Sequence, residues 1–98
     1  MTINKNIDGN KLNIEIEGRL DTMTAPELEA SVKGDLDSVD SAVLDLKKLE
    51  YVSSAGLRVI LTMHKALAGK GGLVVANPNE TVSEVFEVTG FSDILDIQ

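Results

Sequence analysis

Two short, nearly uninterrupted apolar runs, each leading into a stretch with helical periodicity, most constrain what this chain can fold into. They span Ala42 to Leu46 and Leu73 to Ala76. Such runs are typical of buried strands, and the first is predicted to be a central strand covered on both faces. Strands that alternate with helices favour a mixed α/β sheet over a sandwich or a bundle.

The first twenty residues predict a β-hairpin. In residues 3–7 and again in residues 12–16, every second side chain (Ile3, Lys5 and Ile7, then Leu12, Ile14 and Ile16) is flanked by polar neighbours. Asp8, Gly9 and Asn10 supply a turn between the two segments. A period of two indicates strands with one solvent-exposed face, which is typical of the edge of a sheet. The second strand is predicted to end within Gly18 to Asp21.

A first helix is predicted from Thr24 onward. Thr24 can cap the helix, Pro26 suits its first turn because proline lacks an amide hydrogen, and Glu27 stands at the capping-box position. The inward face of this helix is predicted to consist of Leu28 and Val32, with Leu36 as a continuation. Gly34 or the stretch from Asp35 to Asp40 ends it.

Two more helices and a last strand are predicted. The second helix follows Ser53 to Gly56 and stops at the glycines of residues 69–72. Its apolar face comprises Leu57, Ile60, Leu61, Leu67 and Ala68; Val59 and Met63 either complete a broad buried face, which the pattern favours, or form a docking patch. The third helix starts at Asn77 to Asn79, presents Val82, Val85, Phe86 and Thr89 inward, and stops at Gly90. Residues 94–97 are a possible edge strand.

These elements make a single domain spanning residues 1–98, with the order β-β-α-β-α-β-α-β in one mixed sheet. Lys47 to Val52 is expected to be a connector. The chain has 9 basic and 16 acidic residues, a net charge of −7. Nucleic acid and anionic membranes are therefore poor partners, and a protein with a basic face is a better one. No signal peptide or membrane-spanning run is recognisable, so we expect a cytoplasmic protein.

The residue inventory argues against an enzyme. There is no cysteine, no Gly-x-Ser-x-Gly elbow and no metal-ligand constellation, and His64 is the only histidine. His64 lies too far along its helix to act as a base for Ser54, and is expected at the surface or boundary. The glycines of residues 69–72 follow a helix rather than a strand, which is the wrong context for a phosphate loop. We expect no cofactor and no metal.

Ser53 and Ser54 are the candidate functional residues. They stand between a predicted strand and the start of a helix, where sites form in open α/β sheets. One interpretation is that a serine simply caps the helix, which the local pattern favours. The other is that a phosphate attached here would be accommodated by the helix N-terminus. The two interpretations are compatible, since one serine can cap while the other reacts.

Three motifs in register then suggest a family. The segment from Val43 to Leu57 resembles the signature of the STAS family, specifically of bacterial anti-sigma-factor antagonists. In that signature an apolar strand ending in Asp-Leu or Asn-Leu precedes an aromatic residue and Asp-Ser-Ser/Thr/Ala-Gly-Leu. Gly18 to Asp21, followed by Thr24, resembles the family's Gly-x-Leu-Asp segment. Phe86 to Phe91 resembles its Phe-x-x-Ser/Thr-Gly-Leu/Phe motif.

The resemblance implies a STAS fold and a switch. Gly56 matches the motif glycine, so the phosphorylated serine would be Ser54; the chain has Ser53 where the family usually has Asp. The unmodified protein would bind an anti-sigma factor serine kinase of the histidine-kinase-like ATPase type and so release a sigma factor. Phosphorylation would end binding, and a serine phosphatase would reset the site. The partner-facing residues would be Asp21, Thr22, Ser53, Ala55 and Gly56.

Three alternatives stay open from the sequence. Asp21 could instead be a helix-entry residue that makes local hydrogen bonds. The whole domain could be a non-switching STAS subunit of a transporter or a sensory assembly, in which case Ser54 is only a cap. A small enzyme with an unrecognised site is the third alternative.

Overall fold

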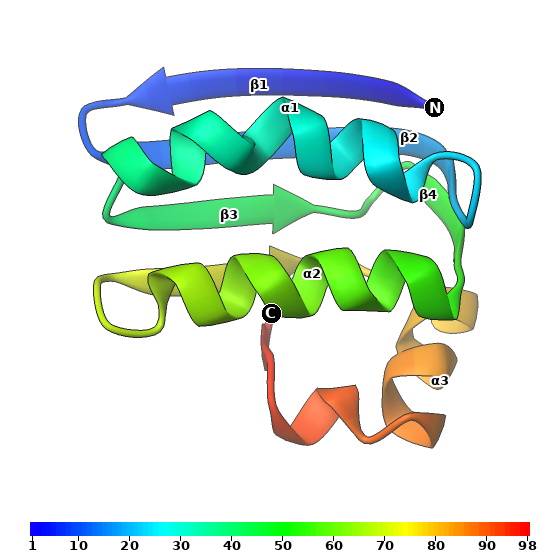
Figure 1. Cartoon of the computed structure of the whole chain (residues 1–98). Helices are drawn as coiled ribbons and strands as arrows, with labels where there is room; N and C mark the ends of the chain where they lie inside the picture. The colour runs from blue at the N-terminus through cyan, green and yellow to red at the C-terminus, as the bar shows by residue number, and fades with distance from the viewer.

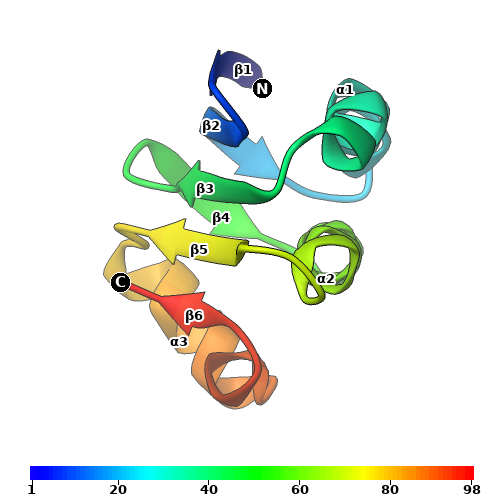
Figure 2. The same ribbon diagram turned by 90° about the vertical axis from the view of Figure 1, so that its left-hand side faces the viewer.

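The computed structural model, which describes all residues 1–98, is a six-stranded sheet with two helices laid side by side over one face (Figures 1 and 2). The strands run in the order β1-β2-β3-β5-β6, and β4 pairs with β2 off this path. The β1–β2 hairpin is antiparallel and the other pairings are parallel. The strands are β1 (Thr2–Asp8), β2 (Lys11–Leu20), β3 (Ser41–Asp45), β4 (Leu49–Val52), β5 (Gly72–Ala76) and β6 (Asp96–Ile97). The predicted mixed α/β class is confirmed.

The core lies between the sheet and the helices α1 (Ala25–Ser38) and α2 (Ser54–Leu67). The predicted stripe of Leu28, Val32 and Leu36 on α1 is buried. On α2, Val59 and Met63 are buried as well, which confirms the broad-face interpretation. Leu61 is only half-buried and Ala68 is exposed, because α2 ends at Leu67.

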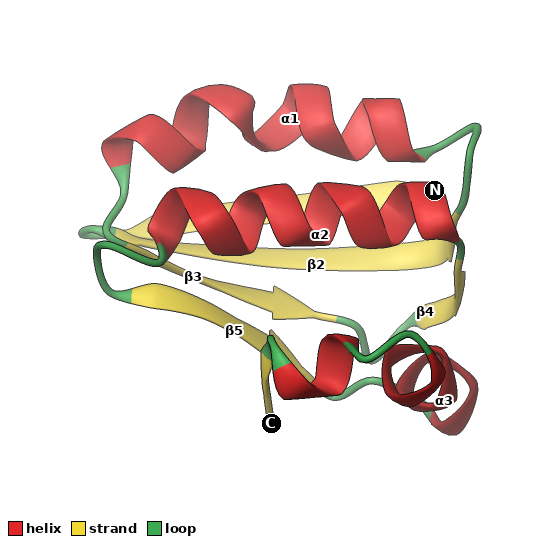
Figure 3. Ribbon diagram, turned by 60° about the horizontal axis from the view of Figure 1, so that its bottom comes forward, coloured by secondary structure: helices red, strands yellow, loops and turns green.

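The prediction that β3 is covered on both faces is wrong. Alternate residues of the strands face α1 and α2, whereas Val43 and Val74 are paired neighbours on the opposite face and are only half-buried. The third helix, α3 (Glu80–Val88), packs against β4 and the short 3-10 helix η1 (Phe91–Asp93). It therefore lies beside β4 at the end of the sheet (Figure 3) and leaves the second face open.

The predicted connector between β3 and α2 contains the strand β4. It forms because β2 is ten residues long: β3 pairs with its first half, from Lys11 to Glu15, and β4 pairs with its last residues, from Gly18 to Leu20. The register is irregular between Gly18 and Arg19, where Gly18 adopts a φ of +103° that favours glycine. The long strand β2 thus pairs with both β3 and β4.

Most element ends lie where the sequence places them. Helix α1 runs through Gly34 and ends at Ser38, so the Asp35–Asp40 alternative holds. Asn79 caps α3 by accepting a hydrogen bond from the Val82 amide at 2.8 Å. Gly90 follows α3 with a φ of +80°. None of the helices has the length and apolar character needed to cross a membrane.

Candidate functional site

The carboxyl ends of β2 and β4 bring two loops together at one edge of the sheet. Leu20 and Val52 are paired in the parallel register, and the Ser53 amide donates to the Leu20 carbonyl at 2.8 Å. The loop that follows β2 therefore lies beside the residues that follow β4, and both α1 and α2 start at this edge (Figure 1). We call this edge the serine rim; it comprises Asp21, Thr22, Met23, Ser53 and Ser54.

The two serines have different environments. Ser53 is the N-cap of α2: its backbone is extended, and its Oγ accepts a hydrogen bond from the Gly56 amide at 3.4 Å. Ser54 is the first residue of the helix; its side chain is exposed and its hydroxyl makes no hydrogen bond within the chain. The sequence left open which serine caps, and the structure assigns the cap to Ser53. The Ser54 hydroxyl is therefore exposed and takes no part in capping the helix.

Gly56 is buried beneath the rim. A Cβ atom at this position would lie 2.6 Å from Leu20 Cγ and 2.9 Å from the Leu20 carbonyl oxygen. The absence of a side chain therefore allows α2 to approach the end of β2. Ala55 is half-buried and packs against the core. Of the predicted partner-facing residues after β4, Gly56 is thus part of the support of the rim rather than its outer surface.

Asp21 organises the loop between β2 and α1. Its carboxylate accepts hydrogen bonds from the amides of Met23 and Thr24 at 3.0 and 3.1 Å. Partial burial acts to raise the pKa of Asp21, but these amides, the Thr24 hydroxyl and the Arg19 guanidinium outweigh it and hold the pKa below its ordinary value. The local hydrogen bonds expected for a helix-entry residue are therefore present, and contact with a partner stays a prediction.

Thr24 does not cap α1 through its side chain, contrary to the sequence prediction. Its Oγ1 accepts from the Asp21 amide at 2.8 Å and donates to the Arg19 carbonyl at 2.8 Å, and no capping bond forms. The Thr24 amide donates to Asp21 instead of to Glu27. The hydroxyl is used to close the loop because the chain turns back on itself immediately before the helix begins.

Sequence reasoning missed three exposed side chains near the serine rim. Met23 is 86% exposed although it is apolar. The chain's two arginines also lie close by: Arg19 stacks over the Tyr51 ring at 4.7 Å, and Arg58 is exposed one turn after Ser54. A net charge of −7 pointed to a basic partner, but this edge of the molecule exposes cations. Only the fold shows that both arginines lie near one site.

Comparison with known proteins identifies the family. The family model described as the STAS domain matches residues 2–98. This chain belongs to the STAS domain family. Its relatives include a protein named as an anti-sigma factor antagonist, BtrV of Bordetella bronchiseptica, which is 39% identical over 84% of this chain and 72% of its own length. The anti-sigma-B factor antagonist of Bacillus subtilis is 30% identical over 99% of this chain and 92% of its own length.

The fold of this STAS domain is also that of solved structures. The anti-sigma factor antagonist SpoIIAA in its unphosphorylated form superposes with a TM-score of 0.84 at 19% identity, over 99% of this chain and 88% of that one. The STAS fold that the sequence motifs implied is therefore confirmed. At 19% identity the match shows the fold alone.

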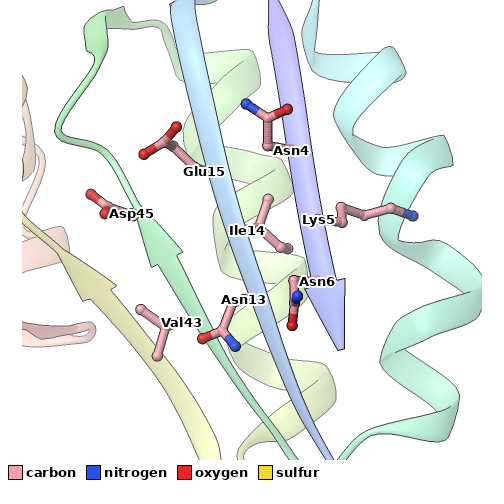
Figure 4. Close-up of a pocket in the computed structure, with 8 residues that line it drawn as sticks. All are labelled: Asn4, Lys5, Asn6, Asn13, Ile14, Glu15, Val43 and Asp45. Carbon is pink, nitrogen blue, oxygen red and sulfur yellow. The ribbon is translucent and has the colours of Figure 1, made fainter. Parts of the chain in front are cut away.

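Elsewhere the STAS domain has no second constellation of reactive groups. A shallow pocket beside β1, β2 and β3 is lined by Asn4, Lys5, Asn6, Asn13, Ile14, Glu15, Val43 and Asp45 (Figure 4). Lys5 reaches away from it to bind Asp35, with Nζ 2.7 Å from the carboxylate. No three His, Cys, Asp or Glu side chains gather as a metal ion would require. His64 is half-buried, as predicted for a boundary residue.

Proposed function

We propose that this STAS domain is an anti-sigma factor antagonist that docks through the serine rim on an anti-sigma factor serine kinase and thereby releases a sigma factor. The observation that carries the proposal is the free, exposed Ser54 hydroxyl at the start of α2, next to a serine that already fulfils the capping role. Two relatives of 30% identity or more are named as anti-sigma factor antagonists, which supports the same function here. Such a protein acts in the cytoplasm, where sigma factors work.

Phosphorylation of Ser54 is the proposed off-switch. A phosphate adds about −1.5 to −2 charges and three acceptor oxygens in the middle of the contact surface. Because the Ser54 hydroxyl holds no structural hydrogen bond, the modification leaves the fold intact. A loss of about 2.8 kcal/mol of binding free energy lowers affinity a hundredfold. A serine phosphatase restores the free hydroxyl. ATP is bound by the kinase, so the STAS domain itself needs no cofactor.

Replacing Ser54 tests the switch. We expect Ser54→Asp to weaken binding to the anti-sigma factor kinase encoded in the same genome by tenfold or more, measured by calorimetry, because the added charge lies within the interface. Ser54→Ala should bind like the wild type and take up no phosphate from the kinase and ATP. The matched control is Ser38→Asp, which adds the same charge at the opposite end of α1, about 20 Å along the helix from its start.

The Ser38→Asp control and the far-UV spectra separate an effect specific to Ser54 from a general effect of added charge or of unfolding. Ser38→Asp should retain wild-type affinity, and all variants should keep a native far-UV spectrum. If Ser54→Asp binds as tightly as the wild type, Ser54 is not the switch, and a non-switching STAS subunit becomes the better description. A transporter or sensor component recovered with the native protein would support that alternative.

A further inference from the structure

We propose that Arg58 is the internal cation that pairs with the phosphate on Ser54. The inference rests on the proposed function, because it concerns the modified form of the same serine. It assigns a role to a side chain that neither caps a helix, nor packs in the core, nor forms an ion pair in the structure. The role is to position the phosphate on the surface of α2.

The spacing of the two residues sets up the contact. Ser54 and Arg58 are both exposed and four residues apart on α2, which places their Cβ atoms about 5–6 Å apart on one face of the helix. Side chains on a helix lean toward its N-terminus, so a long residue covers the turn that precedes its own Cα. At this spacing the Arg58 guanidinium can therefore reach a phosphate on Ser54.

Arg58 is available because nothing else neutralises it. It belongs to none of the ion pairs of the chain, and α2 contains no Asp or Glu between Ser54 and Leu67. Its neighbours one turn away are Ala55, Leu61 and Thr62, none of which carries a charge. In a chain with 16 acidic residues, an exposed arginine on a helix without any acid is a cation without an internal partner.

The other charged groups at or beside the rim, Arg19 and Asp21, are already engaged. Arg19 stacks on Tyr51, and its Nε lies 3.9 Å from the Asp21 carboxylate. That carboxylate is in turn bound by backbone amides of its own loop. A phosphate on Ser54 would therefore find Arg58 as its free counter-ion. Pairing would also remove the exposed Arg58 cation from the surface that meets the kinase, so one modification changes two contact groups.

The test measures the phosphate directly and needs no binding partner. Phosphoserine is incorporated at position 54 during translation, and the second pKa of the phosphate is read from a ³¹P NMR titration at low salt. An arginine at this spacing stabilises the dianion, so we expect Arg58→Ala to raise that pKa by roughly 0.3 unit. Arg58→Lys should keep most of the wild-type value. Lys65→Ala is the matched control, since Lys65 is an exposed cation about 10 Å further along α2.

Each outcome decides the question. A rise with Arg58→Ala but not with Lys65→Ala supports the pair. Equal pKa values in wild type and Arg58→Ala overturn it, as does an equal rise in both variants, which would reflect only the overall charge. Because the phosphate is installed without the kinase, the result stands even if Ser54→Asp shows no effect on partner binding. Melting curves of the unmodified variants verify that each is folded.

Discussion

Replacing Gly56 with alanine tests how the serine rim is supported. The added Cβ would lie 2.6 Å from Leu20 Cγ, 2.9 Å from the Leu20 carbonyl oxygen and 3.0 Å from Leu20 Cδ2. Leu20 is completely buried, so its side chain has no free space into which it can turn. The carbonyl oxygen is fixed too, because it accepts the hydrogen bond of the Ser53 amide. The substitution must therefore push α2 away from the end of β2.

The size of the effect follows from two opposing contributions. Overpacking a close-packed core costs typically 1–3 kcal/mol, and the contact with fixed backbone places this site at about the upper end. Alanine recovers about 1 kcal/mol of helix propensity relative to glycine. The net loss is about 2 kcal/mol, which in a domain of this size corresponds to a melting temperature lower by roughly 8–16 °C.

Urea denaturation of Gly56→Ala, with Gly34→Ala as the control, measures this loss. Gly34 lies inside α1, and a Cβ there would have no atom within 4 Å, so this variant should gain roughly 0.5–1 kcal/mol. The same chemical change should thus have opposite signs at the two positions. If Gly56→Ala is as stable as the wild type, the close approach of α2 to Leu20 does not require a glycine, and the account of the rim's support is refuted.

Two further substitutions test the loops of the rim. Ser53→Ala should lower the free energy of unfolding by about 1 kcal/mol in urea denaturation, because the amide of Gly56 loses its acceptor; unchanged stability would mean that Ser53 does not cap α2. Asp21→Asn should be less stable than the wild type at neutral pH. The folded pKa of Asp21 lies below its ordinary value of 3.8, so its stabilising effect is present above that value and is lost as the pH falls through the folded pKa. The difference between the two proteins should therefore shrink in acid, and a difference that is constant with pH would contradict the assignment.

Particular residues show where prediction from sequence succeeded. The stripe of Leu28, Val32 and Leu36 and the buried pair Val59 and Met63 follow from helical periodicity, because each helix buries one apolar face against the sheet and the neighbouring helix. The β1–β2 hairpin follows from alternation and a local turn. These features depend on residues that are neighbours in the chain or one turn apart.

Other features depended on contacts between distant segments. Strand β4 has only four residues and no distinctive pattern, and it exists because β2 extends past β3 and offers a free edge. Thr24 matched an N-cap by sequence, but the turn of the chain directs its hydroxyl to Arg19 and the amide of Asp21. The apolar character of β3 suggested cover on both faces, whereas α3 packs at the end of the sheet.

The sequence by itself determined the order of the helices and of every strand except β4, most of the buried helix faces and the serine pair at the start of α2, because propensity, capping and periodicity act over a few residues. Only the tertiary structure decided which serine caps and which is free, why Gly56 must lack a side chain, and that Arg19, Arg58 and Met23 surround the same site. Those properties arise where the ends of β2 and β4 meet, 32 residues apart in the chain, and the pairing of Leu20 with Val52 creates them. Propensity, capping and periodicity cannot predict that pairing, because the packing of the whole sheet determines it.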